Sequence, residues 1–410
     1  MNIIVMGLGF VGLTTALGFA EKGHSVLGLD TDTSRTAELA SGKVSLFEPG
    51  LPEALARNIG KNFNVISTLP KEYTDIQAVF ICVGTPCGDD RSTDFKYIYS
   101  TLDMLEPLLN SGLFNGVIVI KSTVPPGSTS TKIIPYLRGK GIKTPVVNNP
   151  EFLREGYCWE DFMNPDRIVC GTEESGTEDI LKTVYNDFNA PVIITSLNTA
   201  EFIKYLSNTM LASMISFSNE MSIIAQSIGG ISVKQAFETL HMDRRWANAS
   251  ITSYVYPGCG FGGYCLPKDL EAMIEQAKSY GVKPVLLEGV QEVNKSMASF
   301  FINTVSADIS ESIGILGLSF KPKSDDVRNT PAADIISALL NKGYKSIYAY
   351  DPEAIANFRK EFPFALNYCE SADEVCERAK TVLIVTAWQQ FKGIDKRWPD
   401  VKFVDGRYML

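Results

Sequence analysis

The stretch Ile3-Ile4-Val5-Met6-Gly7-Leu8-Gly9-Phe10-Val11-Gly12 decides the fold of the first part of the chain. Its apolar start predicts a buried strand, and its glycines follow the pattern G-x-G-x-x-G. A helical pattern then runs to about Lys22, and a second strand leads to Asp30. Strand, glycines, helix, strand and terminal acid in this order are typical of a dinucleotide-binding Rossmann unit.

Each residue type in this motif suits one part of a dinucleotide. Gly7 permits a tight turn, Gly9 lets the backbone approach a pyrophosphate, and Gly12 lets helix and strand pack closely. Asp30 would bind both ribose hydroxyls and repel a 2′-phosphate, so NAD is favoured over NADP. Arg35 could contact the adenine or a phosphate of the dinucleotide, or it could be a solvated helix residue, and the sequence favours neither interpretation. The predicted cofactor-binding residues here are Gly7, Gly9, Phe10, Val11, Gly12, Asp30 and Arg35.

Strand and helix patterns then alternate to about residue 195, which predicts a doubly wound parallel sheet. Ligands of such sheets bind beyond the carboxyl ends of the strands. Three predicted strands end in polar or turn residues: Val83–Pro86, Lys121–Ser128 and Asn148–Gly156. Each segment alone could be an ordinary turn, because such residues are usual in turns. Three such segments at one edge of a sheet favour a ligand-binding site. Glu151 and Glu155 are the first carboxylates offered to it.

The stretch from about Thr199 to Gly229 predicts one helix of about 30 residues, because apolar residues recur there at helical spacing without an internal Pro or Gly. Such a helix could connect domains and mediate dimerisation. Lys204 and Asn208 lie on one face of it. From spacing alone, Lys204 is a solvated charge.

Residues 258–269 read Gly-Cys-Gly-Phe-Gly-Gly-Tyr-Cys-Leu-Pro-Lys-Asp. The glycines predict a loop that approaches something closely. Cys265 follows the loop, and Pro267 suits the first position of a helix. A thiol beside a helix N-terminus and Lys268 is favoured as a thiolate, which would be a nucleophile. The alternative is a buried structural cysteine, and the loop with Pro267 favours the functional interpretation.

The last hundred residues predict a second, smaller α/β domain, with strands at 312–320, 346–350, 381–386 and 402–405. Lys321, Arg328 and Arg407 are cations that it could offer to a diphosphate, although each alone is more often a surface charge. The predicted fold is therefore two Rossmann-like doubly wound domains, 1–196 and 301–410, joined by a central helical domain, 197–300, with one long helix.

Composition excludes several classes of function. The 410 residues carry a net charge of −9, which argues against a general nucleic-acid binder. No apolar run reaches membrane-spanning length, and the N-terminus has no signal-peptide pattern, so a cytoplasmic location is expected. The eight cysteines contain no Cys-x-x-Cys pair, so neither a metal site nor a disulfide framework is predicted.

Four segments then resemble the UDP-glucose/GDP-mannose dehydrogenase family, and with the first glycine motif the resemblance covers nearly the whole chain. They are Asn149-Pro-Glu-Phe-Leu-Arg-Glu, Glu201-Phe-Ile-Lys-Tyr-Leu-Ser-Asn, Phe261-Gly-Gly-Tyr-Cys-Leu-Pro-Lys-Asp and Phe320-Lys-Pro-Lys-Ser-Asp-Asp-Val-Arg-Asn-Thr-Pro. The resemblance implies a four-electron oxidation of a nucleotide sugar's C6 alcohol to a carboxylate with two NAD⁺. The residues Leu266–Asp269 favour UDP-glucose as the substrate.

The resemblance also implies roles for individual residues. Cys265 would form a thiohemiacetal and then a thioester, and Glu151 would assist acid–base steps. The residues that would steer protons and stabilise the oxyanion are Lys204, Thr123, Asn208 and Asp269. The NAD site would add Thr85, Thr123, Glu155 and Arg328. The UDP-sugar would be held by Glu151, Phe152, Leu153, Arg154, Glu155, Lys204, Asn208, Tyr256, Gly262, Cys265, Lys321 and Arg407. A neighbouring subunit of a homodimer would lend Arg245, with Arg244 as the second choice.

Trp246 departs from the family pattern after this arginine, which leaves the hexose open. UDP-N-acetylglucosamine, UDP-N-acetylmannosamine and GDP-mannose are the alternative substrates. A two-electron hydroxyacid dehydrogenase would share the glycine motif but would need no cysteine. A nucleotide-sugar sensor without activity is the remaining class, and no residue favours it.

Overall fold

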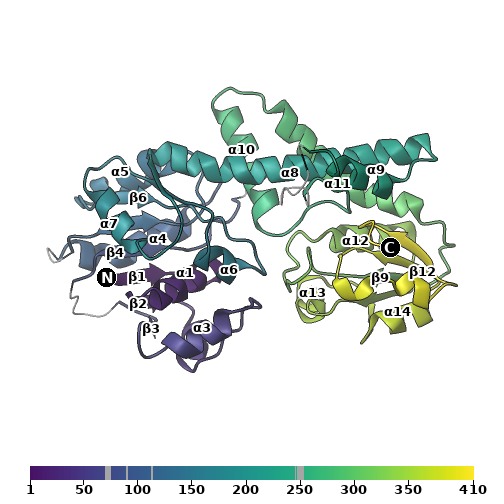
Figure 1. Cartoon of the computed structure of the whole chain (residues 1–410), viewed down its shortest axis with the longest axis horizontal. Helices are drawn as coiled ribbons and strands as arrows, with labels where there is room; N and C mark the ends of the chain where they lie inside the picture. Colours follow the sequence, from purple (N-terminus) through teal and green to yellow (C-terminus); the bar gives the residue numbers. More distant parts are fainter. Residues whose placement is uncertain (70–74, 89–90, 112–113, 245, 247–253) are drawn as a thin grey trace. The chain divides into compact units, whose positions relative to one another are not determined.

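The computed structural model describes residues 1–69, 75–88, 91–111, 114–244, 246 and 254–410. The chain forms two units, Met1–Leu206 and Ser207–Leu410. The predicted long helix is confirmed as α8, Leu197–Ile228, which begins in the first unit and ends in the second (Figure 1). None of the described helices combines the length and the apolar character needed to cross a membrane.

The first unit contains an eight-stranded sheet in the order β3-β2-β1-β4-β5-β6-β7-β8, flanked by helices. The first six strands have the order of a classical Rossmann fold. The strands are β1 (Asn2–Met6), β2 (Ser25–Leu29), β3 (Phe63–Ile66), β4 (Ala78–Ile81), β5 (Val117–Ile120), β6 (Val146–Asn148), β7 (Ile168–Gly171) and β8 (Val192–Thr195). The helices are α1 (Phe10–Glu21), α2 (Thr33–Ala40), α3 (Leu51–Asn58), α4 (Lys96–Leu109), η1 (Thr129–Ile133), α5 (Ile134–Gly139), α6 (Cys158–Met163) and α7 (Thr177–Val184).

Alternate residues of the strands of this sheet enter two separate cores, because successive side chains of a strand point to opposite faces. Ile3 and Val5 of β1 pack with α1 and α3, whereas Ile4 and Met6 pack with α4. Helices therefore cover both faces, and the predicted doubly wound architecture is confirmed.

The prediction of a wholly parallel sheet is wrong at one pairing. β7 runs antiparallel to β6, which it meets at Asn148 and Gly171, and β8 then pairs parallel to β7. A buried apolar run shows that a strand is present but not its direction. Antiparallel strands at the margin of a parallel sheet are common. The ends of β1, β4, β5 and β6 still share one edge, because these strands are mutually parallel.

The second unit contains a five-stranded parallel sheet in the order β11-β10-β9-β12-β13 (Figure 1). It is also covered on both faces, because Ile313 and Ile315 of β9 enter one core and Leu316 enters another. The strands are β9 (Ile313–Leu316), β10 (Ile347–Tyr350), β11 (Asn367–Tyr368), β12 (Thr381–Ile384) and β13 (Lys402–Asp405). The helices are α9 (Val233–His241), α10 (Cys265–Ser279), α11 (Val285–Thr304), α12 (Pro331–Lys342), α13 (Ile355–Glu361), α14 (Ala372–Arg378), η3 (Gln389–Phe391) and α15 (Ile394–Arg397).

The start of α10 differs from the prediction. The helix begins at Cys265, so Pro267 is its third residue and not its first. The first four N–H groups of a helix have no acceptor within it, so proline is tolerated throughout the first turn. Cys265 therefore belongs to the helix and does not precede it.

Candidate functional site

The glycine motif forms an open cradle at the carboxyl end of β1. Gly7 has a φ of +87°, and a Cβ on Gly12 would lie 1.7 Å from the Gly7 carbonyl oxygen, so neither position accepts a side chain. A Cβ on Gly9 would meet no atom within 4 Å. Among the described residues no side chain caps α1, so its first N–H groups are available to a phosphate. The cradle fits the pyrophosphate of NAD.

Asp30 lies at the end of β2 beside this cradle and is 7% exposed. Its carboxylate accepts hydrogen bonds from the Leu8 N–H at 2.7 Å and the Asp32 N–H at 2.9 Å. Arg35 donates to it as well, with Nη1 2.9 Å from Oδ2. The structure therefore places Arg35 in an ion pair. An ionised carboxylate here accepts ribose hydroxyls and repels a 2′-phosphate, which fits NAD.

The ends of β4 and β5 are joined by side-chain hydrogen bonds. The Thr85 hydroxyl donates to the Thr123 carbonyl at 2.8 Å, and the Ser122 hydroxyl donates to the Val83 carbonyl at 2.7 Å. Thr85 and Thr123 therefore lie together at the sheet edge that carries the glycine cradle.

Glu151 and Lys204 form a buried ion pair. Lys204 Nζ lies 2.8 Å from Glu151 Oε1, and their side chains are 5% and 6% exposed. The other carboxylate oxygen accepts the Leu153 N–H at 2.6 Å. Burial opposes ionisation of Glu151, but the Lys204 ammonium, the Leu153 N–H and Lys121 together hold the carboxyl's pKa below its usual value. The prediction from spacing alone, that Lys204 is a solvated charge, is wrong.

Glu201 anchors α8 one turn before Lys204. Its carboxylate is 1% exposed and accepts the Gly127 N–H at 2.6 Å and the Thr129 N–H at 2.8 Å. The segment Lys121–Ser128 that carries Thr123 is thereby tied to the helix that carries Lys204. Sequence reasoning did not single out Glu201, because an acid on a helix normally indicates a solvated face.

Lys121 is a second buried lysine that sequence reasoning did not single out. It is 4% exposed, and its Nζ donates to Asn149 Oδ1 at 3.0 Å. Burial lowers the pKa of its ammonium, and Glu151 is among the groups that oppose this shift. The signal in the sequence was its position as the last residue of a predicted strand.

The loop after β6 contains the other predicted residues of the first unit. The Arg154 guanidinium pairs with Asp161 and lies 57% exposed. Phe152 has two cations near its ring, Lys204 and Arg167, whose charged groups are 5.6 and 4.2 Å from the ring centroid. Glu155 belongs to the same loop. The structure brings residues 151–155 and Lys204 together.

In the second unit Asp269 is 1% exposed and organises two neighbours. Asn208 Nδ2 donates to Oδ2 at 2.6 Å, and Lys268 Nζ donates to Oδ1 at 2.6 Å. Burial opposes the charge on Lys268, but the Asp269 carboxylate outweighs it and raises the lysine's pKa. Asn208 and Asp269 are therefore joined directly, and Lys268 is fixed one turn beyond Cys265.

The glycine loop before Cys265 is enclosed by other backbone. A Cβ on Gly262 would lie 2.1 Å from the Asn329 carbonyl oxygen, and the Gly263 N–H donates to the Arg328 carbonyl at 2.9 Å. The Arg328 guanidinium lies 4.6 Å from the Tyr264 ring centroid and also pairs with Asp326. The Cys265 side chain is exposed and forms no disulfide.

The other predicted substrate residues of the second unit lie around the same loop. Arg407 approaches Gly258, where a Cβ would lie 2.5 Å from Nη1, and its Nε donates to the Val385 carbonyl. The Tyr256 hydroxyl donates to the Tyr408 carbonyl at 3.4 Å. Lys321 lies over the Phe320 ring, 5.3 Å from its centroid. Arg245 lies outside the described residues, whereas Arg244 is described and exposed.

The second sheet does not repeat the ribose site of the first. Asp351 ends β10 as Asp30 ends β2, but its oxygens accept six hydrogen bonds and it is 1% exposed. The donors are the N–H groups of Leu318, Ser319, Glu353 and Ala354, the Ser319 hydroxyl and the Trp388 indole. A carboxylate so fully engaged is structural.

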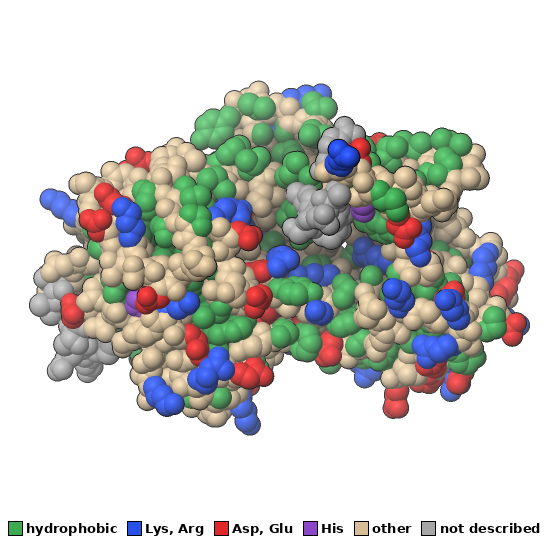
Figure 2. Space-filling model, in the orientation of Figure 1, with side chains coloured by type: hydrophobic (Ala, Val, Ile, Leu, Met, Phe, Trp, Pro, Cys, Tyr) green, Lys and Arg blue, Asp and Glu red, His purple; other side chains and the backbone are tan. Residues whose placement is uncertain are grey.

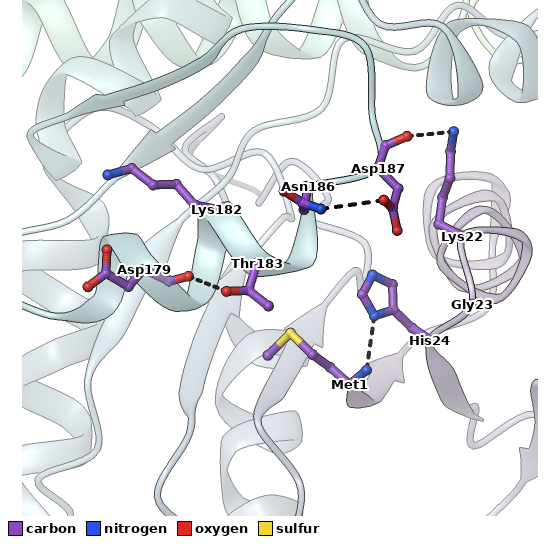
Figure 3. Close-up of a pocket in the computed structure, with 9 residues that line it drawn as sticks. All are labelled: Met1, Lys22, Gly23, His24, Asp179, Lys182, Thr183, Asn186 and Asp187. Carbon is purple, nitrogen blue, oxygen red and sulfur yellow. Dashed lines mark hydrogen bonds between the residues drawn. The ribbon is translucent and has the colours of Figure 1, made fainter.

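A separate hollow lies at the opposite edge of the first sheet. It is lined by Met1, Lys22, Gly23, His24, Asp179, Lys182, Thr183, Asn186 and Asp187 (Figure 3). Met1 and His24 precede β1 and β2, whereas the glycine cradle follows β1. This hollow is therefore not the dinucleotide cradle. Among the described residues no cluster of three or more His, Cys, Asp or Glu could hold a metal ion.

Comparisons with known proteins agree on one family. Models of the UDP-glucose/GDP-mannose dehydrogenase family match residues 1–189 as the NAD-binding domain, 198–296 as the central domain and 314–410 as the UDP-binding domain. The UDP-glucose 6-dehydrogenase of Rickettsia bellii is 37% identical over 405 residues, which span 96% of this chain and 91% of the relative. The UDP-glucose 6-dehydrogenase AglM of Haloferax volcanii is 33% identical, with 100% and 97% covered. The solved structure of a UDP-glucose dehydrogenase from Pyrobaculum islandicum superposes with a TM-score of 0.93 at 35% identity and covers 100% of this chain and 94% of that one.

Proposed function

Because the chain belongs to the UDP-glucose/GDP-mannose dehydrogenase family, we propose that it oxidises the C6 alcohol of UDP-glucose to the carboxylate of UDP-glucuronate. The protein is an NAD-dependent oxidoreductase. The observation that carries the choice of UDP-glucose is the full-length likeness to relatives named for this activity. In this proposal residues 1–196 bind NAD, residues 197–300 form the central helical domain and residues 301–410 bind the UDP-sugar.

The proposal assigns the covalent steps to Cys265. NAD⁺, when bound, accepts the hydride in each of the two oxidations. The first oxidation turns the alcohol into an aldehyde and releases one proton. The Cys265 thiolate then adds to the aldehyde carbon and the carbonyl oxygen takes up a proton, which gives a thiohemiacetal that keeps the intermediate on the protein. The second oxidation removes a hydride and a proton and yields a thioester. Water then displaces the thiolate and releases the carboxylate with two protons.

The ionic side chains of each unit supply charge and proton transfer. Lys204 places a buried positive charge beside Glu151, and such a charge stabilises a developing alkoxide. Glu151, held ionised by this pair, takes the proton that the alcohol or the attacking water loses. Asn208 and Asp269 provide a hydrogen-bonded pair for the same chemistry. Thr123, near the end of β5 in the first unit, is proposed to take part in it as well. Cys265 needs its exposed position to reach a substrate.

The proposed substrate contacts are Phe152, Leu153, Arg154 and Glu155 in the first unit and Tyr256, Gly262, Lys321 and Arg407 in the second. Thr85, Glu155 and Arg328 are proposed to complete the cofactor site. Arg245 of a second copy is proposed to contact the substrate, which would make the dimer part of the active enzyme. A cytoplasmic location is part of the same proposal.

The dimer proposal is supported by an apolar stripe on α8. Phe202, Leu206, Met210, Phe217, Met221, Ile224 and Ile228 recur every three, four or seven residues and are each between 41% and 70% exposed. Their spacing puts them on one face of the helix. Hydrophobic side chains gather over the end of α8 in Figure 2. A stripe of this length on a long helix suits a second copy of the same helix.

A panel of nucleotide sugars tests the substrate. Purified protein with NAD⁺ is offered UDP-glucose, UDP-N-acetylglucosamine, UDP-N-acetylmannosamine and GDP-mannose, and NADH absorbance is followed to completion. We expect turnover of UDP-glucose with two NADH per sugar. One NADH per sugar would mean an aldehyde product, and brisk turnover of another sugar without UDP-glucose turnover would refute the substrate assignment. Trp246 is partly buried against the cluster of Val233, Phe237 and Val255. Because this residue departs from the family pattern, the N-acetylated sugars are included in the panel.

A further inference from the structure

Glu48 is a buried carboxylate to which the proposed reaction gives no role. It lies between α2 and α3 and is 3% exposed. Its Oε2 accepts the Gly156 N–H at 2.7 Å, and its Oε1 accepts the Cys158 N–H at 2.7 Å. It therefore holds a loop that lies more than a hundred residues further along the chain, directly after β6.

Carboxylates accept four backbone N–H groups between Leu153 and Cys158, and the Tyr157 N–H donates to the Arg154 carbonyl. The Leu153 N–H donates to Glu151, the Arg154 N–H donates to Asp161, and the next two contacts are those to Glu48. The segment has no strand ladder, because it lies between β6 and α6. Its shape therefore depends on these side-chain acceptors, and Glu48 supplies two of them.

Packing fixes the approach of Glu48 to the loop. Gly50, two residues later, has a φ of +90°, and a Cβ there would lie 2.5 Å from Cδ1 of Trp159. Only glycine fits this contact, so the segment that carries Glu48 is in direct contact with the residue after Cys158.

We propose that Glu48 is a positioning residue for the nucleotide sugar. By holding the backbone at Gly156 and Cys158, it sets the place of residues 152–155, which the proposed function assigns to the UDP-sugar. The inference rests on that function. Glu48 touches neither the sugar nor NAD in this proposal, and it acts only through the backbone of the loop.

A Glu48→Gln variant should separate substrate binding from cofactor binding. The amide keeps the shape but can accept only one of the two N–H groups, and its own N–H₂ opposes the other. Losing one charge-assisted hydrogen bond in a buried site corresponds to a change of roughly tenfold or more. We expect KM for UDP-glucose to rise by about this factor, whereas KM for NAD⁺, to which only Glu155 of this loop is assigned, should rise by a clearly smaller factor. Glu48→Asp, which keeps the charge, should recover part of the loss.

Glu21→Gln is the matched control. Glu21 is also a carboxylate of the first unit and pairs with Arg57 and Asn58, but among the described residues it forms no hydrogen bond or ion pair with the loop after β6. Both KM values should stay unchanged in this variant. The thermal midpoint of each variant is measured in parallel, so that a general loss of stability is seen.

The outcomes separate the two proposals. Wild-type protein that oxidises no sugar overturns the proposed function and this inference with it. Active wild type with an unchanged KM for UDP-glucose in Glu48→Gln overturns the inference alone. An equal rise of both KM values, with no recovery in Glu48→Asp, assigns Glu48 a general structural role and also overturns it. If Glu48→Gln does not fold, the comparison of Glu48→Asp with wild type decides by the same two KM values.

Discussion

Lys204 Nζ lies 2.8 Å from Glu151 Oε1, and both side chains are almost completely buried. Breaking a buried ion pair by removing one partner leaves the other charge without compensation, which costs about 3–5 kcal/mol. We expect Lys204→Met to lower the free energy of unfolding by about this amount. The double variant Lys204→Met with Glu151→Gln should recover much of it, because neither member of the pair is then left as an uncompensated charge. Urea unfolding of the four proteins of this cycle measures both values.

The same pair sets the pH dependence of the reaction. Lys204 lowers the pKa of Glu151 against the opposing effect of burial, so removal of the ammonium should raise that pKa. The carboxylate form, which takes up the proton, then disappears at a higher pH. We expect the acid limb of the kcat/KM profile of Lys204→Met to move to higher pH. An acid limb that stays in place would show that Glu151 is not the group that titrates.

The motif residues and the long helix were predictable because local signals specify them. A buried strand followed by spaced glycines fixes the turn over Gly7, and a stretch of helical periodicity from Thr199 is long enough to define α8. The polar residues after β4, β5 and β6 were predictable as neighbours, because the carboxyl ends of parallel strands lie at the same edge of a sheet. The exact start of α10 was not predictable, because proline suits several positions of a helix's first turn. Cys265, and not Pro267, is the first residue of the helix.

The residues that hold the site were not predictable for a physical reason. Glu201 and Glu48 each bind two backbone N–H groups that lie far away in the sequence. Nothing in the local pattern of either carboxylate distinguishes it from a solvated surface acid. Asp351 shows the converse, since its position at a strand end resembles that of Asp30 but its hydrogen bonds are already taken. Such distinctions depend on tertiary contacts.

Cys265→Ser should stop the reaction without preventing substrate binding. A serine hydroxyl adds poorly to the aldehyde, and no thioester can form. We expect formation of the carboxylate product to fall by about 10⁴-fold or more, in the range seen when other enzymes lose their nucleophile. Calorimetric titration with UDP-glucose should give a dissociation constant close to that of wild type. Loss of binding together with activity would indicate a structural role for Cys265, whereas full activity would favour a two-electron hydroxyacid dehydrogenase.

The apolar stripe of α8 predicts the effect of a charge placed within it. Phe217 is 55% exposed near the middle of the stripe, and Phe217→Lys would bury an unpaired ammonium in a dimer. We expect this variant to be monomeric by light scattering at concentrations where wild type is dimeric. Gln226→Lys is the control, because position 226 lies on the opposite side of the helix and is exposed. A wild-type monomer, or a Phe217→Lys dimer, would refute the assigned interface.

Stability of the first unit should fall at mildly acidic pH because of His24. Its Nδ1 lies 3.2 Å from the Met1 ammonium (Figure 3). Its Nε2 lies 2.9 Å from the Val184 carbonyl oxygen, so the neutral ring with a proton on Nε2 satisfies both contacts. Burial, with the nearby ammonium, lowers the pKa of His24, although the Val184 carbonyl and Asp187 oppose the shift. The unfolded chain therefore takes up a proton at a higher pH than the folded chain does.

The sign of the effect follows from that difference. The contribution of His24 is fully present above its unfolded pKa of about 6.5 and is lost as pH falls toward the lower folded pKa. We expect the thermal midpoint of wild type to fall more steeply between pH 7.5 and pH 5.5, two values about one unit on either side of 6.5, than that of His24→Gln. The glutamine keeps a donor and an acceptor but does not titrate. Parallel curves for the two proteins would show that another group causes the acid sensitivity.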